Sequence, residues 1–331
     1  MSKLLVADIG GTKIDFAVID TADPVFSPVV EGVFASKDYD SCVAAVSACL
    51  DYFDGQVDFL SLAVAGPVQD QQVSFTNLPW QTEATALKKN FSLKGVLLLN
   101  DLAALAEGVG LLDSDDLALV KQGNILPLGT RLAVAPGTGL GAAFGASGKT
   151  GFPVQATEAG HLSFAPRNEV ESKLYSFLHD QYGHVSVEMV CSGTGLGNIF
   201  SFLQKSGMAV SDELETQLES SHHLGAILSA RVVNKGIDCP ISTRTYEIFF
   251  DLLAEFCGNL AVTLLPEGGI YLGGGMLLHV APLMDSQRFV DRFVDRGQMS
   301  SLVESFSINI INHPRTALLG AYAAGRRIFL I

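Results

Sequence analysis

Two glycine-rich turns and one Asn-Asp pair are the residues of this chain whose types and spacing could carry chemistry. The turns are Asp-Ile-Gly-Gly-Thr at 8–12 and Gly-Thr-Gly-Leu-Gly at 137–141, and Asn100-Asp101 closes an apolar run between them. Glycine lets backbone N–H groups approach a phosphate closely, and an aspartate at the end of a strand faces the crevice where α/β sheets bind ligands. The combination predicts a phosphoryl-transfer enzyme.

Apolar runs flank both turns and predict the strands that position them. Residues 4–7 precede the first turn and 14–20 follow it, an arrangement typical of a β-hairpin. The second turn repeats the layout, with 132–135 before it and 142–145 after it. Two similar hairpins, one in each half of the chain, predict a duplicated architecture that holds one nucleotide.

Predicted strands and helices alternate through the first hundred residues, which indicates an α/β domain. A hinge is expected near 113–124, where polar residues surround one short strand. We expect further strands near 29–35, 59–65, 73–75, 96–99 and 269–272, and helices over 41–53, over 83–91, from 101 onward and over 316–331.

The composition disfavours several classes of partner. The chain has 331 residues, 21 of them basic and 35 acidic, and this balance argues against nucleic-acid backbones and anionic membrane surfaces. An anionic nucleotide must then be held by backbone amides, hydroxyls and Mg²⁺. The five cysteines are scattered without a Cys-x-x-Cys pair, which argues for reduced thiols and against a zinc or disulfide framework. Because the sequence has neither a signal-peptide core nor an apolar run of membrane-spanning length, we expect no membrane association and a cytoplasmic location.

Several of these features have a purely structural alternative. Asp8 is the kind of residue found in hairpin turns, and Asp101 could be the N-cap of the helix that follows it. The Gly-Gly-Gly at 273–275 could be a structural turn, although three successive glycines suggest a large ligand against the backbone. The string Gly-Thr-Gly-Leu-Gly recurs at 193–197, where we favour a helix start that supports the ligand pocket over a second phosphate loop.

The motifs, taken in order, resemble a known family. Asp-Ile-Gly-Gly-Thr near the N-terminus, Leu-Asn-Asp-Leu-Ala-Ala at 99–104 and the turn at 137 are followed by Glu-Ala-Gly-His at 158–161, by Glu188 before Ser-Gly, and by Gly-Gly-Gly-Met at 273–276. This series is similar to that of the bacterial ATP-dependent glucokinases of the hexokinase/actin-like ATPase superfamily, from residue 4 to about residue 276.

The resemblance implies a fold. It predicts a two-domain α/β actin-like ATPase (ribonuclease H-like) fold with an interdomain cleft, and the segment 316–325 resembles the returning C-terminal helix of the family. The small domain is expected to comprise 1–115 plus 316–331, and the large domain 116–315. The family also implies a homodimer.

The resemblance implies roles for individual residues as well. The expected reaction is phosphorylation of D-glucose at O6 by ATP, with Asp101 as general base and with Asp8 holding Mg²⁺ through water. The implied sugar ligands are Asn77, Asn100, Asp101, Glu158, His161 and Glu188. The implied nucleotide-binding residues are Ala7, Asp8, Ile9, Gly10, Gly11, Thr12, Gly137, Thr138, Gly139, Gly273, Gly274 and Gly275.

Two alternatives stay open beside this function: a kinase of another hexose, and a sugar-binding regulator without catalysis. A related group of kinases and repressors pairs its histidine with a downstream Cys-x-Cys-Gly-x-x-Gly-Cys zinc cluster. In this chain no cysteine occurs between His161 and Cys191. That zinc site is therefore not expected here.

Overall fold

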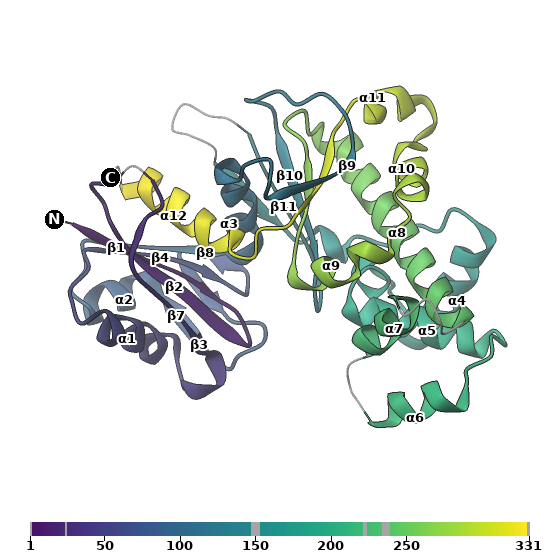
Figure 1. The fold of residues 1–331 in the computed structure, drawn as a ribbon, viewed down its shortest axis with the longest axis horizontal. Helices are drawn as coiled ribbons and strands as arrows, with labels where there is room; N and C mark the ends of the chain where they lie inside the picture. Colours follow the sequence, from purple (N-terminus) through teal and green to yellow (C-terminus); the bar gives the residue numbers. More distant parts are fainter. Residues whose placement is uncertain (1, 24, 147–152, 221–223, 234–238, 330–331) are drawn as a thin grey trace. The chain divides into compact units, whose positions relative to one another are not determined.

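The computed structural model describes residues 2–23, 25–146, 153–220, 224–233 and 239–329 (Figure 1). The chain divides into two compact units. Unit 1 comprises 1–117, 143–156 and 313–331, and unit 2 comprises 118–142 and 157–312.

Unit 1 is built on a sheet whose strand order is β3-β2-β1-β4-β8. β1 and β2 are antiparallel with Ile9 opposite Ile14, which confirms the predicted hairpin around the first glycine turn. β4 and β8 run parallel to β1, and Val64 is in register with both Ile9 and Asn100. The first turn and the Asn-Asp pair therefore follow strands that end at the same edge. The strands are β1 (Lys3–Ile9), β2 (Lys13–Asp20), β3 (Pro28–Ala35), β4 (Phe59–Val64) and β8 (Gly95–Asn100).

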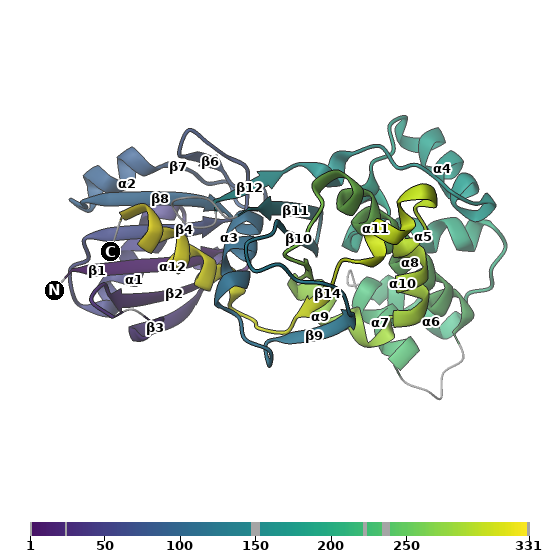
Figure 2. The same cartoon turned by 90° about the horizontal axis from the view of Figure 1, so that it is seen from above.

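Helices cover both faces of this sheet. Alternate residues of β1 point to opposite sides, so each face has its own apolar core. Leu5 belongs to a core with residues of α1 (Cys42–Phe53) and α2 (Ala84–Asn90). Leu4 belongs to a separate core with residues of α3 (Asp101–Gly108) and α12 (Thr316–Phe329). In Figures 1 and 2, α12 lies across the face opposite α1. The expected C-terminal helix is present up to Phe329; its last two positions, 330–331, lie outside the described residues.

A small antiparallel sheet, β5-β6-β7, also belongs to unit 1. It is tied to the main sheet by Gln71, whose Nε2 donates to the carbonyl oxygen of Leu98 at 3.2 Å and whose Oε1 accepts from the N–H of Leu98 at 2.8 Å. Its strands are β5 (Val68–Gln69), β6 (Gln72–Ser74) and β7 (Gln81–Glu83). Unit 1 also has two short 3-10 helices, η1 (Ser36–Asp38) after β3 and η2 (Val109–Leu111) after α3.

A second sheet has the order β12-β11-β10-β13-β14-β9. β10, β13 and β14 are parallel, and Val134 is in register with Leu272. The turn at 137–141 and the glycines at 273–275 therefore follow neighbouring strands at one edge. The strands are β9 (Leu117–Lys121), β10 (Arg131–Pro136), β11 (Leu140–Gly145), β12 (Val154–Thr157), β13 (Ile270–Leu272) and β14 (Ile308–Ile311).

Helices make up most of the remainder of unit 2. α5 begins at Gly193, and Ser192 is its N-cap, so the predicted helix start at the repeated glycine string is confirmed. The helices are α4 (Glu169–Tyr182), α5 (Gly193–Lys205), α6 (Asp212–Ser220), α7 (Leu224–Val233), α8 (Pro240–Leu264), α9 (Gly275–Val280), α10 (Ser286–Val294) and α11 (Ser300–Glu304), with 3-10 turns η3 (Ala159–His161), η4 (Val187–Met189), η5 (Ala281–Leu283) and η6 (Gly297–Met299).

A buried ion cluster joins three of these helices. Arg292 of α10 pairs with Glu171 of α4 at 2.5 Å and also with Glu255 of α8. Burial, followed by the negative charge of Glu171, raises the pKa of Glu255 to about 7, although Arg292 acts in the opposite direction. The cluster therefore couples helix packing to the protonation of one carboxyl.

Candidate active site

The first glycine turn is held by hydrogen bonds from Ser36, a residue that no sequence motif indicated. The N–H of Gly10 donates to the carbonyl oxygen of Lys13 at 2.9 Å and closes the turn. The fully buried Ser36 donates from Oγ to the carbonyl oxygen of Gly10 at 2.7 Å, and from its N–H to that of Thr12 at 3.0 Å. The N–H groups of Gly11 and Thr12 meet no acceptor among the described residues. Two backbone donors are thus available to an anion.

Asp8, at the end of β1, lies close enough to Asp101 for the two charges to interact. Burial, and then the negative charge of Asp101, raise the pKa of Asp8 to about 7, while Lys13 acts in the opposite direction. Such a pair of carboxyl groups is stabilised by a cation between or beside them. Carboxylate oxygens are the ligands that Mg²⁺ prefers, so the donor set fits this ion.

Asn100, and not Asp101, is the N-cap of α3. The Oδ1 atom of Asn100 accepts from the N–H of Leu102 at 3.0 Å and of Ala103 at 3.2 Å. The alternative interpretation that Asp101 is the N-cap is therefore wrong, because Asp101 is the first residue of the helix. Its Oδ1 accepts from the N–H of Leu102 at 2.9 Å. The helix start thereby holds the Asp101 carboxylate at the N-terminus of α3.

Asn77 packs against the first turn. A Cβ atom added to Gly11 would lie 2.9 Å from the Cβ of Asn77, so the second glycine of the turn is needed for this loop to approach. Asn77 itself is exposed. Unit 1 therefore brings together the first turn with Asp8, Asn77, and the Asn100-Asp101 pair from three separate stretches of sequence.

The second turn has the same pattern of open amides. The N–H of Gly137 donates to the carbonyl oxygen of Gly139 at 2.8 Å, and the N–H of Leu140 donates to Glu188 Oε2 at 2.8 Å. Within the described part of the chain, the N–H groups of Thr138 and Gly139 have no acceptor. Since Thr138 is exposed, this turn too offers donors to an anion.

The three glycines after β13 differ in what they contact. Gly274 has φ +95°, and an added Cβ would lie 3.0 Å from the carbonyl oxygen of Pro136, so the backbone alone accounts for this glycine. An added Cβ at Gly275 would meet no atom within 4 Å. Gly273 is held by its N–H, which donates to the carbonyl oxygen of Val134 at 2.9 Å. The predicted contact of these glycines with a nucleotide stays a prediction.

Glu158, His161 and Glu188 lie on two loops that pair with each other. The N–H of Val187 donates to the carbonyl oxygen of Leu162 at 2.9 Å, and Ser163 forms an antiparallel bridge with Ser186. Glu158 immediately precedes η3, which His161 ends, and Glu188 is in η4. Unit 2 thus brings the three predicted sugar ligands to the second turn, although 27 positions separate His161 from Glu188.

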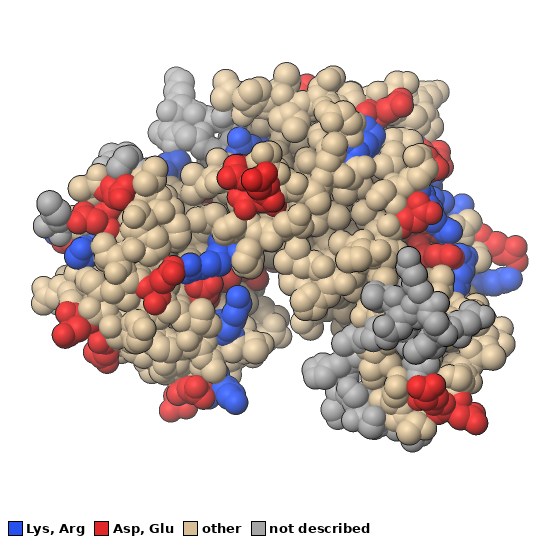
Figure 3. All heavy atoms as spheres, viewed as in Figure 1, with Lys and Arg blue, Asp and Glu red and all other residues tan. Residues whose placement is uncertain are grey.

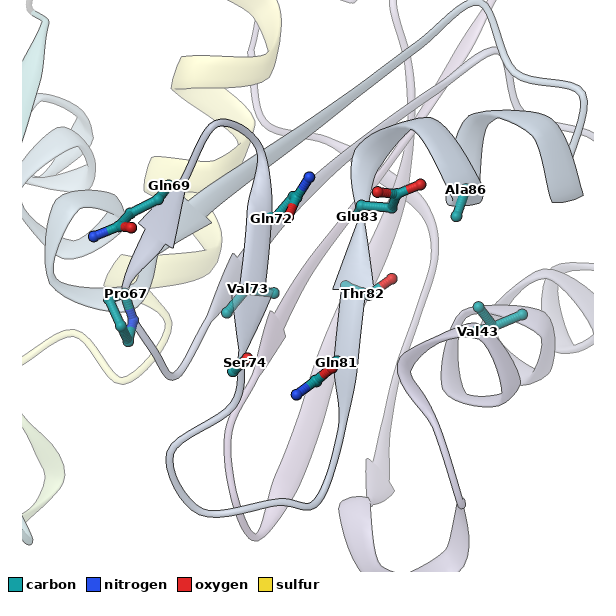
Figure 4. Close-up of a pocket in the computed structure, with 10 residues that line it drawn as sticks. All are labelled: Val43, Pro67, Gln69, Gln72, Val73, Ser74, Gln81, Thr82, Glu83 and Ala86. Atoms are coloured by element: carbon teal, nitrogen blue, oxygen red, sulfur yellow. The ribbon is translucent and has the colours of Figure 1, made fainter.

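Other features of the surface lie apart from these residues. A cavity of about 620 Å³ is lined by the small sheet of unit 1 together with Val43 and Ala86, and none of the predicted site residues lines it (Figure 4).

Over the described residues, there is no group of three or more His, Cys, Asp or Glu side chains that could hold a metal ion. No helix in the same part of the chain is long and apolar enough to cross a membrane. On the face in Figure 3, Lys and Arg side chains form separate groups among acidic ones.

A family model, relatives of known name and solved structures match this chain to glucokinases. Residues 5–328 match the family model described as Glucokinase. The glucokinase of Trichormus variabilis is 31% identical over 344 residues, which cover 99% of this chain and 100% of that protein. A glucokinase crystal structure from an Antarctic psychrotroph has a TM-score of 0.84 at 30% identity and covers 98% of this chain and 99% of that one. The glucose complex of the Balamuthia mandrillaris glucokinase, at 20% identity and TM-score 0.79, covers 98% of this chain and 94% of that one and shares the fold.

Proposed function

The chain belongs to the glucokinase family, and from that premise we propose that it transfers the terminal phosphoryl group of ATP to the 6-hydroxyl of D-glucose. Its fold is the two-domain actin-like sugar-kinase fold. The observation that carries the proposal beyond family membership is the Asp8–Asp101 pair beside a turn with open amides. A phosphoryl-transfer site needs this combination of a base, a cation ligand and phosphate donors.

We assign the chemical step to Asp101. Its carboxylate accepts the proton of the sugar 6-hydroxyl while that oxygen attacks the terminal phosphorus in line with the leaving oxygen. The helix start at Asn100 holds the carboxylate in place. Asn77 and Asn100 are proposed as further sugar ligands in unit 1.

Asp8 is proposed to hold Mg²⁺, through water. Bound there, the ion neutralises charge on the phosphate oxygens. The N–H groups of Gly11 and Thr12 donate to the same phosphates, while Ala7, Ile9 and Gly10 shape the backbone that presents them.

In unit 2 the second turn is proposed to hold phosphate through the N–H groups of Thr138 and Gly139, next to Gly137. Gly273–Gly275 are proposed to lie against the nucleoside. Carboxylates and histidine accept and donate to sugar hydroxyls, and a site built in this way discriminates against sugars that lack them. These are the roles proposed for Glu158, His161 and Glu188.

We also propose that the protein is a cytoplasmic homodimer. Each subunit would have a small domain of 1–115 plus 316–331 and a large domain of 116–315. The regulator alternative is not favoured, since the catalytic carboxylate and both glycine turns are intact in this chain. Glucose is proposed as the preferred hexose because the chain belongs to the glucokinase family.

The decisive test is ADP release, measured by a coupled assay, with purified protein, Mg·ATP and a panel of glucose, mannose, fructose and N-acetylglucosamine. We expect the highest kcat/KM with glucose. Binding of glucose without ADP release would support a regulator instead, and a higher kcat/KM for another hexose would change the substrate.

A further inference from the structure

One side chain joins the proposed sugar loops to the proposed phosphate turn. Glu188 Oε2 accepts the N–H of Leu140, the fourth residue of the second turn, at 2.8 Å. The same oxygen would lie 2.5 Å from a Cβ added to Gly139, so the carboxylate occupies the space that the missing side chain of Gly139 leaves. Oε1 of Glu188 makes no hydrogen bond to the described residues, and it is therefore the oxygen left for a sugar hydroxyl.

Leu140 is held from both sides of its peptide. Its N–H meets Glu188, and its carbonyl oxygen faces Gly160, where an added Cβ would overlap it. Gly160 lies between Glu158 and His161. Both loops that carry proposed sugar ligands thus rest on one residue of the phosphate turn.

The repeated glycine string holds the other end of the turn. The N–H of Gly193 donates to the carbonyl oxygen of Gly137 at 2.8 Å. Ser192, the N-cap of that helix, donates from Oγ to the carbonyl oxygen of Glu188 at 2.7 Å and accepts from the N–H of Gly195 at 3.1 Å. The helix start therefore fixes both the first residue of the turn and the backbone of Glu188.

We propose that Glu188 is a positioning residue for the nucleotide as well as a ligand of the sugar. Through Leu140, its carboxylate sets the orientation of the Gly139–Leu140 peptide, and so of the adjacent N–H groups that are open to phosphate. Glucose and nucleotide then share one side chain, and each influences the affinity of the other. This inference rests on the proposed function for the identity of the two ligands.

The test measures the affinity for Mg·ADP by calorimetry in the absence of sugar. Glu188→Ala removes the acceptor and should weaken ADP binding about tenfold, as expected for one hydrogen bond to a charged group. Glu188→Gln keeps an acceptor oxygen for Leu140 and should stay within about threefold of wild type. Glu158→Ala is the matched control because, among the described residues, its side chain makes no hydrogen bond or ion pair with the turn, and its ADP affinity should change less than about twofold.

A second variant removes the donor and leaves Glu188 intact. Replacing Leu140 by its α-hydroxy acid analogue converts the N–H into an ester oxygen, and ADP binding should again weaken about tenfold. If both the ester and Glu188→Ala bound ADP as tightly as wild type, Glu188 would be a sugar ligand only. The two proposals can fail separately. If the wild-type protein did not phosphorylate glucose but these variants still bound ADP more weakly than wild type, the proposed function would be refuted and this inference would stand.

Discussion

Gly160→Ala tests whether the carbonyl of Leu140 sets the position of the loop that carries Glu158 and His161. An alanine Cβ at 160 would lie 3.1 Å from the carbonyl carbon of Leu140 and closer still to its oxygen. Both atoms belong to the backbone of β11, so they cannot rotate away as a flexible side chain would. The loop has to move by about 1 Å to restore an ordinary van der Waals contact.

A displacement of this size is large for a catalytic site. Misplacement by about 1 Å costs on the order of a hundredfold in rate, and we expect kcat/KM for glucose to fall by about that factor. The measurement is steady-state ADP release with varied glucose at saturating Mg·ATP. A circular-dichroism melt should accompany it, to establish that the variant is folded.

Gly197→Ala is the matched control in the same unit. There the added Cβ would lie 3.4 Å from Leu224, which is an ordinary contact, and alanine favours a helix more than glycine does. We expect wild-type kcat/KM and equal or higher thermal stability. A folded Gly160→Ala protein with kcat/KM within about threefold of wild type would refute the idea that Leu140 sets the loop.

Further predictions address the other groups. Asp101→Asn should lower kcat at least about a hundredfold with a much smaller change in glucose affinity, and a variant that keeps a tenth of wild-type kcat would exclude Asp101 as the base. Glu158→Ala should lower kcat/KM for glucose at least about tenfold with little change in KM for ATP; damage mainly to ATP use would contradict its assignment to the sugar. Activity lost in EDTA should return with excess Mg²⁺ alone, and a requirement for zinc would contradict the absence of a described zinc cluster. The raised pKa of Glu255 means that the contribution of its protonation to stability is present below pH 4.5 and is lost as the pH rises through about 7. The urea midpoint should therefore fall less between pH 5 and pH 8 in Glu255→Gln than in wild type. Equal falls in the two proteins would show that Glu255 does not titrate in this range.

Local patterns were sufficient for much of the fold. The hairpin at the first turn was predictable because an apolar run, a glycine pair and a second run are all contiguous, and β1 and β2 pair in that way. The helix start at 193 was predictable for the same reason, since its N-cap Ser192 is adjacent. Signals of this kind depend on residues within a few positions of each other.

The choice between neighbours at the start of α3 was not predictable in the same way. Asn100 and Asp101 are both good capping residues, and only the backbone decides between them. Asn100 has φ −62° and ψ 144°, an extended conformation at the end of β8, so it caps the helix and Asp101 begins it. This choice leaves Asp101 to interact with Asp8.

The sequence by itself determined which chemistry is possible: glycine turns for phosphate, carboxylates for a base and a cation, and the order of motifs that identifies the family. Only the tertiary structure decided which glycines are required by contacts and which are open to a ligand. Gly160 is required because the backbone carbonyl of Leu140 occupies the space of its missing side chain, while Gly139 leaves the space that the Glu188 carboxylate fills. Ser36 beneath the first turn likewise became recognisable only in three dimensions. Such contacts join residues that are distant in the chain, and close packing between distant segments leaves no local pattern in the sequence.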